Sequence, residues 1–397
     1  MSQPLSGPGY RATLAALATG QLLVWATLYY AFSSFVLPMQ SDLGWSRPTL
    51  MGAFTLGLAL WGLGTYAVGS AIDRGHGRSV MAWGPVLGGL GFLVWSRVTQ
   101  PWMLYAAWTL IGLAMAMSMY EAAFSIVTRR YPGQFRQAIT VLTLVGGFAS
   151  TLSFPAIAWL MSLLGWRDTL AALGLVLLAG VAPLHLWALR GTAFASAAAK
   201  PGTQPDATLN EALRHTSFWL LTLCFTLLAF GSAAMWAHVM PAFASKGVSD
   251  VDALTVLVWI GPAQVAGRFA QAWLGQRLSL RTLGSVAMLG QPLALGLFAW
   301  TASLPWLLLF ALLFGLANGL VTIVRGGVVP EYFGRANVGR IAGTMSGIGL
   351  LARAAAPLAA AWLLLLVPGY NELLALLAFF SLLGVLAFWA AGPPRPG

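Results

Sequence analysis

Three arginines lie inside long apolar runs of the sequence, where other charges are scarce: Arg268, Arg325 and Arg353. A charged side chain within hydrocarbon costs several kcal/mol unless it faces water, a partner or a ligand. Arg353 lies about twelve residues into its run, or roughly 18 Å of helix, too deep for its guanidinium to reach the membrane surface easily. Because a guanidinium holds a carboxylate through two parallel hydrogen bonds, we expect Arg353 to bind a small anion. The alternative is a structural pair with a carboxylate of the same chain.

Arg268 belongs to a polar stripe in which Gln264 precedes it by four residues and Gln271 follows it by three. This spacing places the three side chains on one face of a helix, and a polar face in a membrane should turn away from lipid. Asn318 heads a similar stripe, seven residues before Arg325. We therefore expect Gln264, Arg268 and Asn318 to contact a ligand as well. Packing, or support of a gate, is an equally good interpretation of Arg268.

Glu121 and Arg325 occupy matching places near one end of two predicted membrane spans, 204 residues apart. Opposite charges at the same depth attract strongly where the dielectric constant is low. We therefore predict an ion pair between them that closes an inner gate. The alternatives are an arginine at the lipid surface and a glutamate that is paired locally.

Aromatic residues lie on one face of the first apolar run and in part of the seventh. Trp25 and Tyr29 share one face of the first apolar run with Gln21, and Trp236 lies beside His238 in the seventh run. Such rings can wall a small-molecule site, although rings at the ends of spans more often form interfacial belts. A histidine in this place is also commonly a hydrogen-bonded structural residue. We treat Trp25, Tyr29, Trp236 and His238 as candidate ligand contacts.

The composition indicates which elements position these residues. Of the 397 residues, 59% are hydrophobic and 8% are charged, against roughly 25% charged residues in a soluble domain. The chain is therefore predicted to be an all-α membrane protein, in which each crossing helix needs about 20 apolar residues. Twelve runs fit this length: 12–38, 48–72, 79–98, 101–128, 138–164, 169–189, 217–243, 253–275, 282–301, 304–330, 341–366 and 372–391.

The formal charge of +11 does not indicate nucleic acid, because the basic residues form no patch with interleaved aromatic residues. Fourteen of the 21 basic residues fall in one set of alternate loops and four in the other. Since basic loops stay in the cytoplasm, both termini are predicted to be cytoplasmic. The single cysteine, Cys224, excludes an internal disulfide, and the four scattered histidines have no metal-ligand spacing. We expect no cofactor and no metal.

The chain divides into two similar halves. Residues 190–216 are polar and predict a cytoplasmic linker between two six-helix bundles at 1–189 and 217–397. Residues repeat between the halves at a spacing of 203, as in Gly64 with Gly267 and Gly112 with Gly315. A parallel repeat of six spans is typical of transporters with a substrate site at mid-membrane depth.

The loop after the second span has a sequence of its own, Gly69-Ser-Ala-Ile-Asp-Arg-Gly-His-Gly-Arg78. Its glycines permit a tight turn, and a carboxylate beside a membrane needs a partner, so we expect Asp73 to grip another segment. The loop resembles the signature of the major facilitator superfamily at Gly69, Asp73, Arg74, Gly77 and Arg78. Ala71 stands where leucine is usual, and Ser79 replaces the last basic residue. The resemblance implies that these five residues serve a gate. At the matching place in the second half, Gln276-Arg277 lacks the acid.

Three further segments resemble the bacterial branch of oxalate–formate exchangers and monocarboxylate carriers: 29–47, Gly165-Trp166-Arg167 and Tyr332-Phe333-Gly334-Arg335. In that branch a cation on the eighth helix and another on the eleventh hold the substrate carboxylate, which implies that role for Arg268 and Arg353. The acidic-glycine motif of the branch at the first helix is not evident here, which leaves its route of coupling in doubt.

The resemblance implies a secondary transporter of the bacterial inner membrane that moves a small organic anion by alternating access. A proton or a counter-anion would be its coupling partner, and the protein is expected to be a monomer in the lipid bilayer. The alternative is a proton-coupled exporter of drugs or metabolites, with Glu121 as the titratable acid. The sequence contains no phosphate-binding loop of the G-x-x-x-x-G-K-[ST] type. It also lacks a cluster of His, Asp or Ser residues at one membrane face, so an enzyme is not expected.

Overall fold

The computed structural model describes residues 8–191, 206–274 and 279–392, and within these ranges every regular element is a helix. Ten helical segments are long and apolar enough to cross a membrane. Two of these, Pro48–Ser96 and Phe135–Ala188, contain a glycine with non-helical backbone angles, Gly75 and Gly165. Divided at these glycines, the segments account for the twelve predicted spans.

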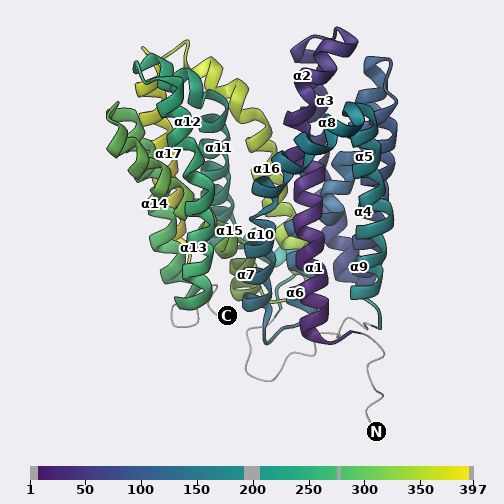
Figure 1. The fold of residues 1–397 in the computed structure, drawn as a ribbon. Coiled ribbons are helices and arrows are strands. Elements are labelled where there is room, and N and C mark those ends of the chain that lie inside the picture. Colours follow the sequence, from purple (N-terminus) through teal and green to yellow (C-terminus); the bar gives the residue numbers. More distant parts are fainter. Residues whose placement is uncertain (1–7, 192–205, 275–278, 393–397) are drawn as a thin grey trace. The chain divides into compact units, whose positions relative to one another are not determined.

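The helices form two compact units (Figure 1), and the first comprises residues 1–206 together with 335–347. Its helices are α1 Tyr10–Val24, η1 Trp25–Tyr30, α2 Ala31–Leu43, α3 Arg47–Ala71, η2 Ile72–His76, α4 Gly77–Ser96, α5 Pro101–Ser118, α6 Tyr120–Arg130, α7 Phe135–Gly146, α8 Ala149–Leu175, η3 Val176–Val181 and α9 Ala182–Ala188. The helix α16, Val338–Leu363, begins in this unit.

The second unit comprises residues 207–334 and 348–397. Its helices are α10 Leu209–Arg214, α11 Thr216–Ser245, α12 Asp250–Val258, α13 Ile260–Leu274, α14 Leu280–Trp300, α15 Leu304–Phe333, the later part of α16, and α17 Tyr370–Ala390. Helix α10 lies in the segment expected to be a linker. It begins with a capping box, in which Thr208 and Glu211 satisfy each other's backbone N–H groups.

The repeat predicted from the sequence recurs as one helix crossing within each unit. In unit 1, a Cβ atom on Gly112 of α5 would lie 2.5 Å from the carbonyl oxygen of Gly57 on α3. In unit 2, a Cβ atom on Gly315 of α15 would lie 2.4 Å from the carbonyl oxygen of Ile260 on α13. Both partners are 203 residues apart, like the glycines themselves. Glycine is needed at both places because the two backbones touch.

The membrane segment that holds α5 and α6 is broken at Met119, whose ψ angle of −176° is extended. Gln21 of α1 is fully buried and donates from Nε2 to the carbonyl oxygen of Ser118 at 2.7 Å. A broken helix leaves carbonyl groups without an intrahelical donor, so the Gln21 amide replaces one of the lost hydrogen bonds. The break places Glu121 in the first turn of α6, where its side chain is buried.

Candidate functional site

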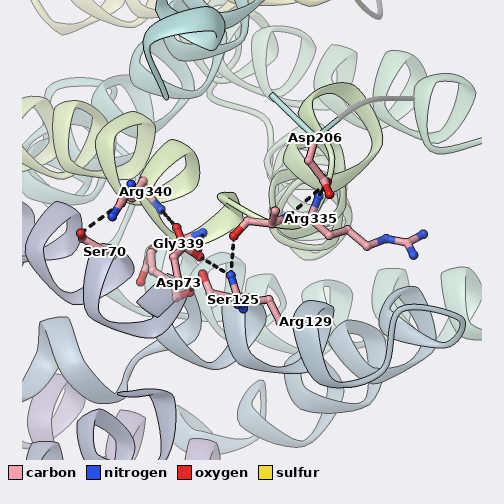
Figure 2. Close-up of polar contacts among 10 residues, drawn as sticks. Ser70, Asp73, Ser125, Arg129, Asp206, Arg335, Gly339 and Arg340 are labelled. Atoms are coloured by element: carbon pink, nitrogen blue, oxygen red, sulfur yellow. Dashed lines mark hydrogen bonds and ion pairs between the residues drawn. The ribbon is translucent and has the colours of Figure 1, made fainter. Parts of the chain in front are cut away.

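The carboxylate of Asp73 is held by the start of α16, within unit 1 (Figure 2). It accepts backbone hydrogen bonds from Gly339 at 2.9 Å and Arg340 at 2.7 Å. These N–H groups belong to the first turn of a helix and have no acceptor in the helix itself. The helix dipole also favours a negative charge at this end. Asp73 thus grips another segment, and that segment is the N-terminus of α16.

Two further side chains close this contact. Arg129 Nη1 at the end of α6 lies 3.3 Å from Asp73 Oδ1 and also donates to the carbonyl oxygen of Ala336. Arg340 Nε donates to Ser70 Oγ at 3.1 Å. The side chains of Asp73 and Arg129 are only 3% and 11% exposed, so water screens their attraction weakly. We name the contacts of Ser70, Asp73 and Arg129 with residues 336–340 the clasp.

Glycines let α16 approach α3 closely enough for the clasp to form. A Cβ atom on Gly69 would lie 1.9 Å from the carbonyl oxygen of Gly339. One helical turn further, Thr65 Oγ1 donates to the carbonyl oxygen of Gly343 at 2.7 Å. Gly347 continues the stripe, with a Cβ position 2.8 Å from the Gly62 carbonyl oxygen. The small-residue stripe of α16 therefore packs against a helix of its own chain.

The rest of the signature loop makes the turn itself. Gly75 has a φ of 95°, which favours glycine, and the flanking Arg74 and Arg78 are exposed. Gly77 is buried at the start of α4. Gln276 and Arg277, which match the loop in the second half, lie outside the described residues.

The sequence indicated that Asp73 needs a partner but did not identify one. In the sequence, Arg129 is only one of the fourteen basic residues in the loops that are predicted to be cytoplasmic. The available signal was the position of Gly339 and Arg340 at the start of the eleventh predicted span, where free N–H groups attract a carboxylate. Nothing in the sequence alone specified which helix N-terminus would receive Asp73.

In unit 2, two predicted polar stripes lie on helices that pack together. A Cβ atom on Gly319 of α15 would lie 2.3 Å from the carbonyl oxygen of Gln264 on α13. Arg268, one turn after Gln264, is buried with 4% exposure. Asn318 and Arg325 on α15 are half-buried. The close crossing of α13 and α15 thus brings the two helices that bear the stripes into contact.

Arg353 is half-buried on α16, in the part of that helix that belongs to unit 2. His238 Nε2 on α11 lies 3.1 Å from the carbonyl oxygen of Pro357, one turn after Arg353. A carbonyl oxygen can only accept, so His238 donates and links α11 to α16. Trp236 is 45% exposed and meets Phe314 edge to face at 6.4 Å. This hydrogen bond fits the structural role that was the alternative interpretation of His238, and contact of His238 with a ligand stays a prediction.

The aromatic face of the first span lies inside unit 1. The Trp25 ring is 9% exposed and packs among Tyr29 at 5.4 Å, Trp61 at 5.9 Å and Tyr120 at 4.9 Å between ring centroids. Tyr29 is half-buried. Trp25 and Tyr29 thus share a face, as predicted, but Trp25 is enclosed by other rings. Glu121 lies in unit 1 and Arg325 in unit 2, so their pairing stays a prediction.

Comparison with known proteins places this arrangement in a family. The family model described as Major Facilitator Superfamily matches residues 17–300. The chain is 27% identical over 296 residues to monocarboxylate transporter 13 of Bos taurus, and 27% identical over 304 residues to monocarboxylate transporter 11 of Mus musculus. These alignments cover 72% of the chain and 66% and 64% of the relatives, so the chain spans slightly less than two thirds of their length.

Two solved structures share the fold. The Escherichia coli fucose:proton symporter FucP has a TM-score of 0.76 at 12% identity, with 96% of this chain and 98% of that chain covered. The human organic anion transporter MFSD10 has a TM-score of 0.71 at 20% identity, with 96% and 100% covered. The family model covers more than half of the sequence. The chain therefore belongs to the Major Facilitator Superfamily, and ten helical segments within its described residues are long and apolar enough to cross a membrane.

Proposed function

We propose that this protein is a secondary transporter that moves a small carboxylate-like organic anion by alternating access. The observation that carries the proposal is the charge of unit 2 within its membrane helices. Arg268, Arg325 and Arg353 lie on α13, α15 and α16, whereas the same three helices contain one acidic residue, Glu331. An excess of positive charge at membrane depth is costly unless an anion balances it, and a carboxylate fits a guanidinium in two-point contact.

The relatives named monocarboxylate transporters favour the same class of substrate. Arg268 and Arg353 are the proposed carboxylate contacts, with Gln264 and Asn318 as neutral hydrogen-bonding groups beside them. Within unit 2, Trp236 keeps exposed surface that an apolar part of the substrate can contact. The contact of Tyr29, which lies in unit 1, stays a prediction. We place the transporter in the bacterial inner membrane with both termini in the cytoplasm, where the basic loops favour it.

The clasp is the proposed inner gate. Asp73 stabilises the start of α16 only while that helix lies against α3, and alternating access requires such contacts to form in one state and break in another. Arg74 and Arg78 remain exposed, which suits an interaction with anionic lipid at the membrane surface.

A second candidate function is proton-coupled export of a drug or metabolite. Glu121 favours it, because a buried carboxylate in a broken membrane segment is a common place for a proton to bind. Under this alternative the substrate would be neutral or cationic, and transport would follow the proton gradient.

Counterflow in proteoliposomes separates the two candidates. Vesicles that contain the purified protein are loaded with unlabelled mono- or dicarboxylates and given the labelled form outside. We expect accumulation of at least one carboxylate without an imposed proton gradient. Uptake of only neutral or cationic drugs, driven by a proton gradient and abolished by Glu121→Gln, would contradict the anion proposal.

The variant Arg268→Gln tests the proposed contact within the same assay. Removing one member of a buried charge pair costs about 2–5 kcal/mol, so the apparent affinity for the carboxylate should fall at least about 30-fold. Arg97→Gln is the matched control, since Arg97 is exposed in a loop and its loss should leave the affinity unchanged. Equal affinity in both variants would remove Arg268 from the site.

A further inference from the structure

We propose that Asp206, at the end of the segment that joins the two halves of the sequence, is a positioning residue of the inner gate. Its carboxylate binds the turn at residues 334–337, which lies between α15 and α16. Asp206 would then take part in gating. This inference rests on the proposed role of the clasp as the inner gate, and it does not depend on which substrate crosses.

The Asp206 carboxylate binds the backbone of that turn directly (Figure 2). Its Oδ1 atom accepts hydrogen bonds from the N–H groups of Arg335 at 2.6 Å and Ala336 at 3.1 Å. Two successive N–H groups that converge on one oxygen form a small anion-binding concavity in the backbone. Hydrogen bonds to a charged acceptor are also stronger than neutral ones. The turn is therefore held by a charge and not only by chain connectivity.

Gly334 gives the turn its shape. Its φ of 81° ends α15 in a conformation that side chains disfavour. Beyond it, the guanidinium of Arg335 lies over the ring of Phe135 at 5.2 Å. The two contacts of Arg335 fix its backbone to Asp206 and its side chain to α7. The turn is thus anchored before α16 begins.

The turn is also part of the clasp. Arg129 donates to the carbonyl oxygen of Ala336, the same residue whose N–H group binds Asp206. Arg129 in turn pairs with Asp73, which binds the N–H groups of Gly339 and Arg340. A continuous series of polar contacts therefore runs from Asp206 through the turn to Asp73. Residues 335–340 are held by two carboxylates, one at each end.

This arrangement has a consequence for opening. The first turn of α16 can leave α3 only if Asp73 releases it, and the preceding turn must then either move with it or bend at Ala336. With Asp206 in place, movement of the turn also requires loss of two charged hydrogen bonds. Asp206 therefore favours the closed clasp, and its removal should open the gate more often.

Thiol labelling measures this opening without any substrate. The background is Cys224→Ala with Val338→Cys, since Val338 is only 3% exposed beside the clasp. The rate of maleimide labelling of the new thiol reports exposure of the α16 start. We expect Asp206→Ala to raise the rate about tenfold, a change of the size expected for lost hydrogen bonds to a charged group. Asp206→Asn keeps an acceptor oxygen and should raise it less.

Three controls make the result specific. Asp73→Asn should also raise the rate, because it weakens the clasp directly. Asp168→Asn removes an exposed carboxylate of the same unit and should have no effect. A thiol placed instead at Ala107, which is fully buried on α5, should stay unlabelled in Asp206→Ala. The proposal is overturned if the Val338→Cys thiol is labelled no faster in Asp206→Ala than in Asp168→Asn, although it is labelled faster in Asp73→Asn. It is also overturned if the Ala107→Cys thiol becomes equally reactive, since Asp206 would then stabilise the whole unit.

Discussion

The two units use the same helix crossing but fill the space around it with different side chains. In unit 1 Gly57 faces Trp108, and a Cβ atom on Gly57 would lie 2.6 Å from the indole ring. The equivalent residues 203 positions later are Ile260 and Ala311, both buried in unit 2. The large side chain at the crossing is therefore Trp108 on α5 in unit 1 and Ile260 on α13 in unit 2. The glycines that let backbones touch are kept, whereas the side chains that fill the remaining volume are exchanged.

The same contrast extends to the chemistry of the units. Unit 1 contains a connected group of rings around Trp25, Trp61 and Trp108, and its main charged feature is the clasp. Unit 2 has arginines where unit 1 has a neutral or acidic residue about 203 positions earlier, since Thr151 lies 202 residues before Arg353 and Glu121 lies 204 residues before Arg325. Contacts shared by both halves maintain the fold. Residues that differ between them are the better candidates for function.

The largest expected effect is on packing in unit 1. Trp108 is fully buried and meets Phe32, Phe54 and Trp95 edge to face. Trp108→Ala should lower the free energy of unfolding by about 3–5 kcal/mol, because it leaves a cavity among rigid rings. Adding Gly57→Ile should restore part of this loss by recreating the arrangement of unit 2. Reversible unfolding in detergent micelles measures both changes. A double variant no more stable than Trp108→Ala would contradict the equivalence of Gly57 and Trp108 with Ile260 and Ala311.

A smaller effect tests whether the two crossings are equivalent. Gly112→Ala and Gly315→Ala each place a Cβ atom about as close to a backbone oxygen of the facing helix. Each should cost about 1–3 kcal/mol, and the two costs should agree, because backbone cannot move aside as a side chain can. Gly296→Ala on α14 is the control, since nothing lies within 4 Å of its Cβ position. If one crossing tolerates alanine and the other does not, the repeat is not a structural equivalence.

The smallest effect concerns two cations that contact the C-terminal ends of helices. Arg167 Nη1 donates to the carbonyl oxygen of Ser96 at 3.2 Å, and Lys246 Nζ donates to that of Ala299 at 2.9 Å. These two carbonyl groups are 203 residues apart, near the ends of α4 and α14. A cation at a helix C-terminus is favourable, so each should contribute less than about 1 kcal/mol. Each unit thus has a cation at an equivalent helix C-terminus, although Arg167 and Lys246 themselves are not at equivalent positions of the repeat.

The two cations should differ in their pH dependence. Burial lowers the pKa of Lys246 from its usual value, with Glu372 opposing this shift. Between the folded and unfolded pKa values the unfolded chain binds the extra proton, so stability should rise as the pH rises through the folded value. Lys246→Gln should remove this alkaline rise in the unfolding midpoint, whereas Arg167→Gln should leave it unchanged because arginine does not titrate there. An alkaline rise that survives Lys246→Gln would assign it to another group.

Much of the fold could be predicted from the sequence because apolar run length and the 203-residue repeat are properties of the chain itself. The arginines inside spans were also visible, since a charge among apolar residues stands out. The partners of Asp73 were not, because a backbone N–H group has no sequence signature. Asp206 was missed for the same reason, as both of its acceptor contacts are to backbone. The burial of Trp25 depends on Trp61 and Tyr120, which lie on other spans.

Equilibrium binding tests the central claim, that arginines of unit 2 hold a carboxylate, most directly. The probe is the carboxylate with the strongest counterflow, compared with its neutral amide by the shift in thermal unfolding of the purified protein. We predict that the carboxylate alone stabilises the protein, that Arg353→Gln weakens binding at least about 30-fold, and that Arg353→Lys retains part of it. Equal stabilisation by the amide, or unchanged binding in Arg353→Gln, would contradict the account.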